Sequence, residues 1–105
     1  MAQFDIYANP NVPQRQVFPY VVQLQHDFFD ALTTRLVVPL QRARIPADAF
    51  PRRLTETIRV QGEQFHIAVH LAAGFPERLL KRPVANARDQ QLVLRNAIDA
   101  LIEGV

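Results

Sequence analysis

The residues with the most obvious potential for chemistry are two histidines, His66 and His70. They fall in a segment, residues 64–71, in which apolar and polar residues alternate, so both imidazoles lie on one face of an expected strand. Two imidazoles on one face could begin a metal site, and Gln64 precedes them on that face. A glutamine amide is not an ordinary zinc ligand, however, and no further ligand is evident. We therefore expect a half-exposed sheet face here and assign neither a metal nor a cofactor to the chain.

Asp27 and Asp30 are a second candidate, because paired carboxylates can carry out acid–base catalysis. Three residues apart in a turn, two carboxylates more often accept hydrogen bonds from backbone N–H groups. Between them lie Phe28 and Phe29, two adjacent aromatic rings that cannot both point easily into a core from a turn. We therefore expect one of these rings at a protein interface.

The composition excludes several classes of chemistry. No cysteine is present, which removes disulfides, thiolate nucleophiles, Cys-ligated zinc and iron–sulfur clusters. The chain also has no GxGxxG, no P-loop and no HExxH, so the commonest nucleotide and zinc-hydrolase signatures are missing. Twelve basic and ten acidic residues give a net charge of +2, too small to indicate nucleic-acid binding by itself. Local arginine clusters, such as Arg42 with Arg44 and Arg52 with Arg53, could favour an acidic partner.

The start of the chain carries no targeting signal that we recognise. The first twenty residues lack the basic start and continuous apolar run of a signal peptide. No stretch approaches the ~20 apolar residues of a membrane span. We expect a cytoplasmic protein without membrane contact.

The elements that must position these residues are mainly strands. A length of 105 residues is enough for one small core, so we expect one domain over residues 1–105. Short runs between prolines predict strands at residues 3–8, 20–25, 35–40, 57–61 and 64–71. Gly62 lies in the short connection between the last two and predicts a hairpin, while Pro39 suggests an edge strand or a bulge. The result is a small, strongly bent sheet over about residues 3–83.

From Asn86 the apolar pattern changes to the period of a helix. One face carries Leu94, Ala97, Ile98, Leu101, Ile102 and Val105. Asn86 followed by Asp89 resembles a capping box, and Gly104 can end the helix, so we predict an α-helix over about residues 86–103. This apolar face and the small core leave more hydrophobic surface than one domain covers. We therefore expect a symmetric homodimer.

Several segments together resemble the CcdB family, the toxins of ccd toxin–antitoxin modules. The matching segments are QFDIY at 3–7, YVVQLQHDFFD at 20–30, TRLVVPL at 34–40, NAID at 96–99 and GV at 104–105. They follow the family's order and span almost the whole chain. The resemblance implies a mainly β fold, an SH3-like small antiparallel barrel that ends in one C-terminal α-helix and forms a symmetric dimer.

The resemblance also implies a function. The expected protein is the toxin of a type II toxin–antitoxin system, which poisons DNA gyrase by binding its A subunit and trapping the DNA-cleaved state. It would be an inhibitor and not an enzyme, with no catalytic residues. A CcdA-like antitoxin would neutralise it, and the pair together would bind operator DNA and repress their own operon, as in plasmid maintenance modules.

Carried over by position, the gyrase contact of the family falls at two places in this chain. One is the aromatic pair Phe28 and Phe29. The other is the C-terminal set, which consists of Asp99, Ile102, Glu103, Gly104 and Val105. The family pattern ends in Trp-Gly-Ile, whereas Glu103 stands at the tryptophan position and the chain contains no tryptophan. Any aromatic contact must therefore come from the phenylalanines.

Two other functions compete with this interpretation. The same small barrel also occurs in mRNA-cleaving toxins, and Arg35 with His66 or His70 could supply a phosphate-binding cation and an acid–base group. Alternatively, the protein is a CcdB-like repressor or antitoxin-binding component that no longer poisons gyrase, which the change to Glu103 would explain.

Overall fold

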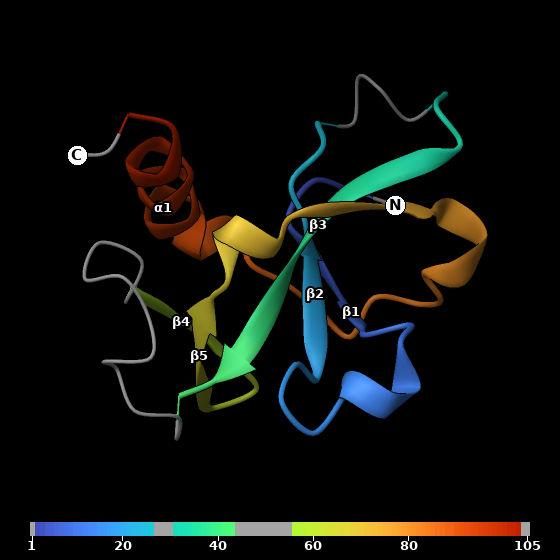
Figure 1. Cartoon of the computed structure of the whole chain (residues 1–105), viewed down its shortest axis with the longest axis horizontal. Helices are drawn as coiled ribbons and strands as arrows, with labels where there is room; N and C mark the ends of the chain where they lie inside the picture. The colour runs from blue at the N-terminus through green and yellow to red at the C-terminus, as the bar shows by residue number, and fades with distance from the viewer. Residues whose placement is uncertain (1, 27–30, 44–55, 104–105) are drawn as a thin grey trace.

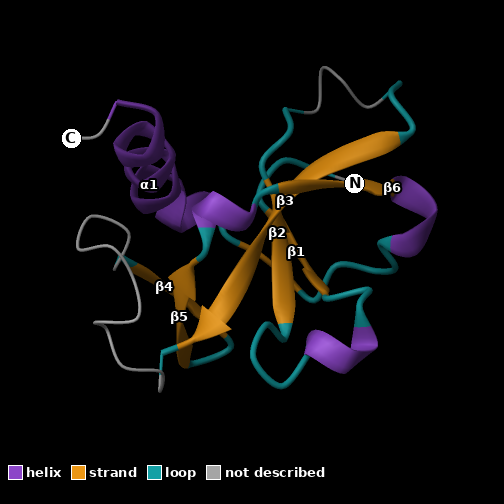
Figure 2. Ribbon diagram, viewed as in Figure 1, coloured by secondary structure: helices purple, strands orange, loops and turns teal. Residues whose placement is uncertain are grey.

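The chain folds into a strongly bent antiparallel sheet with one helix at its C-terminal end (Figures 1 and 2). This computed structural model describes residues 2–26, 31–43 and 56–103. The strands are β1 (Asp5–Ala8), β2 (Tyr20–Gln23), β3 (Thr34–Arg42), β4 (Thr57–Val60), β5 (Glu63–Ile67), β6 (Ala73–Pro76) and β7 (Ala85–Asn86). The helix α1 spans Gln91–Glu103, and short 3-10 turns are η1 (Val12–Gln14), η5 (Val69–Leu71), η6 (Glu77–Leu79) and η7 (Arg88–Gln90).

The strands form a nearly closed barrel-like sheet in the order β4-β5-β3-β2-β1-β7, with β6 beside β3. Every pairing between these strands is antiparallel. The predicted fold class, a small antiparallel barrel with one C-terminal helix, is therefore confirmed. No helix in the described part of the chain is long and apolar enough to cross a membrane.

Strand β3 is the centre of the sheet. Along one edge it pairs with β2, and along the other it pairs first with β6 and then with β5. Pro39 lies where the second edge changes partner, and its carbonyl accepts a hydrogen bond from Ala68 N at 3.0 Å on that edge. In an antiparallel strand, the N–H and the C=O of one residue point to the same side. The N–H that Pro39 lacks would therefore point to this edge, between the end of β6 and the start of β5. The expectation of an edge strand or a bulge was wrong, since the proline occupies an interior strand.

The hairpin predicted around Gly62 is confirmed. Val60 pairs with Glu63, so the turn consists of two residues, Gln61 and Gly62. Both have positive φ, 51° and 84°, as a type I′ turn requires. Glycine takes this conformation without strain, which explains its position in the second place of the turn.

The predicted start of the helix, residue 86, was wrong. Asn86 belongs to β7, where it pairs with Asp5 of β1. Its Nδ2 donates to Asp5 Oδ1 at 2.9 Å, and its Oδ1 accepts from Arg88 N at 2.8 Å. The asparagine therefore begins the turn η7 instead of capping α1, and the helix starts five residues later, at Gln91.

Four predicted strands were too long, those at 20–25 and 57–61 by only two residues and one residue, and two short strands were not predicted. The strand expected over residues 64–71 ends at Ile67, because the chain turns into η5. The strand expected from residue 3 begins at Asp5, because Phe4 adopts a left-handed conformation with φ 69°. The missed strands are β6 and β7.

The main core lies between the concave face of the sheet and α1. Its fully buried members are Phe4, Ile6, Val22, Val38, Leu40, Ile58, Val60, Phe65, Ile67, Ala68, Val69, Ala87, Leu94 and Ala97. Within it, the rings of Tyr20 and Phe65 meet edge to face at 5.4 Å. Leu94 and Ala97 anchor α1 to this core.

Two glutamine side chains bridge the opening between the edge strands β4 and β7. Gln90, just before α1, accepts a hydrogen bond from Arg59 N at 2.7 Å and donates to Arg59 O at 2.8 Å. Gln61 donates to the carbonyl of Val84, next to β7, at 3.4 Å. The Gln90 amide thus takes the place of a strand at Arg59, where β4 would otherwise present unpaired backbone groups.

Replacing Gln90 by alanine should lower the free energy of unfolding by about 1–2 kcal/mol, because two hydrogen bonds to the β4 edge are lost and water replaces them. Urea denaturation followed by circular dichroism measures this change. Gln64→Ala is the matched control, since Gln64 is exposed and its side chain is bonded to no other described residue. Equal losses in the two variants would contradict a special role for Gln90.

Candidate functional site

The C-terminal half of α1 lies on the surface. Its first half is anchored by Leu94 and Ala97, but Leu101 is 44% exposed and Ile102 is 76% exposed. The single apolar face predicted for the helix is therefore buried only in its first half. Among the described elements, α1 packs most closely against η5, η7 and β4, and the last helical turn projects to the periphery of the molecule (Figure 1).

Three residues of the predicted C-terminal contact meet on this exposed end. Asp99, Ile102 and Glu103 are all exposed. Positions three and four residues apart lie on the same side of a helix, so the three side chains form one small surface. This surface combines one apolar side chain with two carboxylates. The other predicted contact residues, Phe28, Phe29, Gly104 and Val105, lie outside the described residues.

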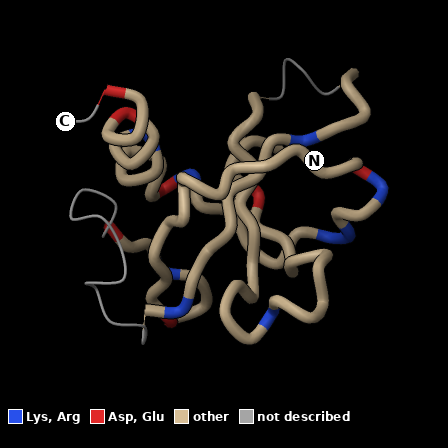
Figure 3. The backbone as a smooth tube through the Cα atoms, viewed as in Figure 1, with Lys and Arg blue, Asp and Glu red and all other residues tan. Residues whose placement is uncertain are grey.

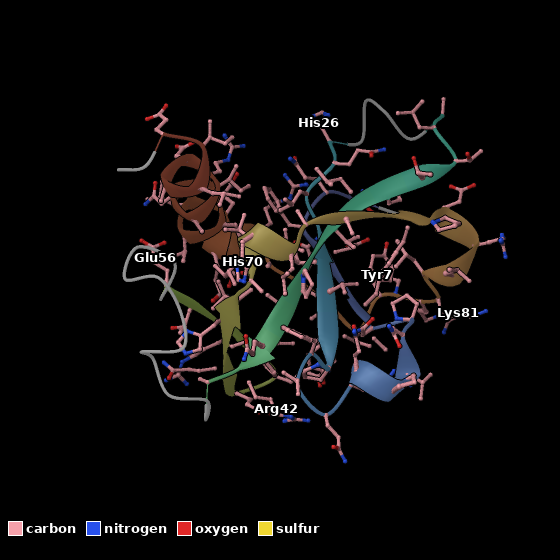
Figure 4. The ribbon with its side chains drawn as sticks, in the orientation of Figure 1. Tyr7, His26, Arg42, Glu56, His70 and Lys81 are labelled. Carbon is pink, nitrogen blue, oxygen red and sulfur yellow. The ribbon has the colours of Figure 1, made fainter. Side chains whose placement is uncertain are left out.

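The chain before residues 27–30 is held by β3, and the chain after them is held by η6. Before this segment, Leu24 N donates to Leu36 O at 2.9 Å, and Leu36 N donates to Gln25 Oε1 at 3.3 Å. After it, Thr33 O accepts from Glu77 N at 2.9 Å. Figure 4 shows His26, the last described residue before the segment, toward the top of the view, where the C-terminal end of α1 also lies.

Arg35 and Glu77 form an ion pair between a buried arginine and a half-exposed glutamate, which the sequence analysis did not predict. Arg35 Nη2 lies 2.8 Å from Glu77 Oε2, and the arginine side chain is only 3% exposed. Arg35 shares a strand face with Val37, which packs in a second cluster with Tyr7, Val21 and Leu80. Arg35 and Val37 are two residues apart, and in a strand this spacing places both side chains on the same face. Burial of the arginine could have been predicted from this spacing.

The burial of Arg35 bears on the ribonuclease hypothesis. Its guanidinium donates to the carbonyls of Leu32 and Thr34 as well as to Glu77. A cation that binds a phosphate needs donors directed to solvent, and these donors are directed into the protein. The role of phosphate ligand assigned to Arg35 in that hypothesis is therefore not supported.

The two histidines do not form a metal site. His66 is in β5 between Thr57 of β4 and Gln41 of β3, and it is buried, with 6% of its surface exposed. His70 is exposed and belongs to η5, because the strand has ended at Ile67. The prediction of one half-exposed strand face carrying both was wrong. Among residues 2–26, 31–43 and 56–103, no three His, Cys, Asp or Glu residues are grouped as a metal site requires.

A hollow of about 390 Å³ lies beside Glu77. Its walls are Thr33, Thr34, Pro76, Glu77 and Arg78. They come from the start of β3, the end of β6 and the turn η6.

The arginine clusters differ in their surroundings (Figure 3). Arg42 pairs with Glu63 at 2.8 Å, whereas Arg44, Arg52 and Arg53 lie outside the described residues. Arg78, Lys81 and Arg82 are exposed on and after η6. In the described part of the chain, no carboxylate lies within 4 Å of these three cations.

The comparison with protein families agrees with the fold. The family model described as CcdB protein matches residues 3–104. The match includes every strand of the sheet, the Arg35–Glu77 pair and the exposed end of α1. The chain belongs to the CcdB family.

Proposed function

We propose that this protein is the toxin of a type II toxin–antitoxin system and that it poisons DNA gyrase. The observation that carries the proposal is the family match over residues 3–104. The arrangement of α1 supports it, because Asp99, Ile102 and Glu103 lie together on the solvent side of the helix. These are three of the positions at which the family contacts gyrase.

The chemistry of the proposed contact differs from that of a relative with tryptophan at position 103. Glu103 cannot stack on a ring, but a carboxylate can form a charge-assisted, two-point contact with an arginine of the gyrase A subunit. Ile102 and the pair Phe28 and Phe29 supply the apolar part. Because ion pairs at an exposed surface are screened by salt, inhibition should weaken as ionic strength rises.

The proposal is tested with purified gyrase, relaxed plasmid and the wild-type protein. We expect supercoiling to stop and linear plasmid to accumulate after detergent and protease treatment, the sign of a trapped DNA-cleaved state. The same reaction without gyrase is the control for nuclease activity. Absence of inhibition at every salt concentration would contradict the proposal and favour the repressor alternative, which the change to Glu103 supports. Cleavage of RNA without gyrase would favour the ribonuclease.

The remaining parts of the system follow from the same proposal. The partners are the gyrase A subunit and a CcdA-like antitoxin, and operator DNA is bound only together with the antitoxin. The protein acts in the cytoplasm as an inhibitor without catalytic residues or a cofactor, as one domain over residues 1–105. The system represses its own transcription, and plasmid maintenance is the role that the family resemblance implies for it.

The protein should be a symmetric homodimer. One small domain leaves apolar side chains such as Leu36, Leu71 and Leu101 exposed in a single copy, and an isologous dimer can cover surface of this kind on both copies. Light scattering at micromolar concentration should give about 24 kDa, twice the 12.0 kDa of the chain. A mass of one chain at this concentration would contradict a dimer.

A further inference from the structure

Lys81 is the only lysine in the chain, and the other eleven cationic side chains are arginines. Its ε-amine is therefore the one side-chain amine that can accept an acyl group. The residue is exposed and lies shortly after η6, at the periphery of the molecule (Figure 4). Within residues 2–26, 31–43 and 56–103, no carboxylate oxygen lies within 4 Å of its ammonium group. Solvent and solutes can therefore reach this amine.

The segment that carries Lys81 is held against the sheet. Before it, Glu77 N donates to Thr33 O at 2.9 Å, and after it, Val84 N donates to a carbonyl of β1 at 2.7 Å. Leu80 is buried in the second cluster and has an extended backbone. Neighbouring side chains of an extended segment point to opposite sides, so burial of Leu80 directs Lys81 into solvent.

Two exposed arginines, Arg78 and Arg82, flank Lys81. Arg82 is its direct neighbour, and Arg78 is three residues earlier, at most ~11 Å away along the chain. The Debye length at physiological ionic strength is ~8 Å, so the guanidinium groups, at the ends of long side chains, act on the solvent around the amine. A guanidinium group can bind a phosphate through two parallel hydrogen bonds. The surroundings of Lys81 therefore attract a phosphate-bearing anion.

Glu77 is the carboxylate nearest to Lys81 in the sequence, and its charge opposes this attraction. Its Oε2 accepts a hydrogen bond from Arg35 Nη2 at 2.8 Å. The positive charge of Arg35 offsets the negative charge of Glu77. The three exposed cations, Arg78, Lys81 and Arg82, thus keep their excess of positive charge.

We propose that Lys81 is a modification site, at which an acyl phosphate transfers its acyl group to the protein. Arg78 and Arg82 attract the phosphate group of the donor and bring its carbonyl carbon close to the amine. The ammonium group first loses one proton to water, and its nitrogen then attacks this carbon. The C–N bond forms, the C–O bond to phosphate breaks, and one of the two remaining protons on nitrogen passes to the leaving phosphate. The products are an amide on Lys81 and inorganic phosphate.

Acylation changes the charge of this surface and leaves the fold in place. The amide is neutral, so the group formed by Arg78, Lys81 and Arg82 loses one of its positive charges, and the net charge of +2 falls by one. Burial of Leu80 and the backbone bonds that hold the segment are unaffected. The proposal does not rest on the function proposed above, because it uses none of the residues assigned to the gyrase contact.

Arg95→Lys supplies a second lysine in the same molecule as a matched control. Arg95 is exposed on α1, and Asp99 follows one helical turn later, so the control amine has a carboxylate near it in place of two flanking arginines. The variant is treated with acetyl phosphate, and acetylation at positions 81 and 95 is followed over time by tandem mass spectrometry. A parallel reaction uses N-acetoxysuccinimide, an acetyl donor without charge.

Acetyl phosphate should acetylate position 81 about five times faster than position 95, because two nearby cations attract the dianion through water. The uncharged donor should acetylate both positions at similar rates, since both are exposed. Adding Arg78→Gln and Arg82→Gln to the control variant should remove the preference for position 81. Circular dichroism should show the same melting temperature, because both arginines are on the surface.

Salt gives a second measurement that needs no change at the two arginines. Sodium chloride at about 1 M shortens the Debye length to ~3 Å and should also remove the preference. Equal rates at positions 81 and 95 with acetyl phosphate at low salt would overturn the proposal. A preference that persists with the uncharged donor, at high salt, or in the folded variant without Arg78 and Arg82 would also overturn it, since accessibility alone would then explain the rates.

Discussion

Replacing Ile102 by asparagine should raise the concentration needed for half-inhibition of gyrase about thirtyfold, with the fold intact. The side chain is 76% exposed at the end of α1, so the substitution opens no cavity. At the centre of a contact surface, loss of an apolar anchor typically costs ~2 kcal/mol of binding, which corresponds to about thirtyfold in affinity. A supercoiling assay across a concentration series measures the change.

Leu92→Asn is the control for this prediction. Leu92 is 68% exposed on the same helix but lies ten positions away, in its first turn. The two variants change the same class of side chain, and light scattering should give the wild-type mass for both. If Leu92→Asn weakens inhibition as much as Ile102→Asn does, the contact is not specific to the C-terminal end of α1.

Replacing Leu94 by alanine should lower the free energy of unfolding by ~2.5–5 kcal/mol, the range for a buried leucine that leaves a cavity. Leu94 is completely buried and is one of two fully buried residues of α1. A domain of this size has ~5–15 kcal/mol in total, so the loss would be a large fraction of the stability. Urea denaturation at constant pH measures it.

Leu92→Ala provides the comparison, because it removes the same atoms from an exposed position two residues earlier. It should change the free energy of unfolding by less than about 0.5 kcal/mol. A small effect at Leu94 would show that the helix contributes little to the core and that packing between the strands carries the stability.

Local patterns predicted the parts of the fold that local chemistry determines. The hairpin around Gly62 follows from a turn that needs positive φ at two residues. The burial of Leu94 and Ala97 in α1 follows from the helical period of the apolar residues. In these cases a few neighbouring residues contain all the information.

The errors arose where a distant partner decides the structure. Asn86 looks like a helix cap, but it is drawn into the sheet by Asp5, 81 residues away. Strand β6 contains Gly74 and Pro76, two poor strand formers, and it is a strand because β3 pairs with it. Arg35 was not recognised as buried because its partner Glu77 follows 42 residues later.

The pairing of β1 with β7 has a consequence for the newly made chain. β1 can pair with β2 almost at once, but its other edge is covered by residues 84–87, which come near the end of the chain. At ~5–20 residues per second, the ribosome needs about 4–16 s to add the residues that separate Asp5 from Asn86. During that interval the outer edge of β1 presents unpaired backbone groups, the feature by which strands of different chains associate. Protection of this edge by chaperones would thus matter most while the chain is still being made, and would end when β7 arrives.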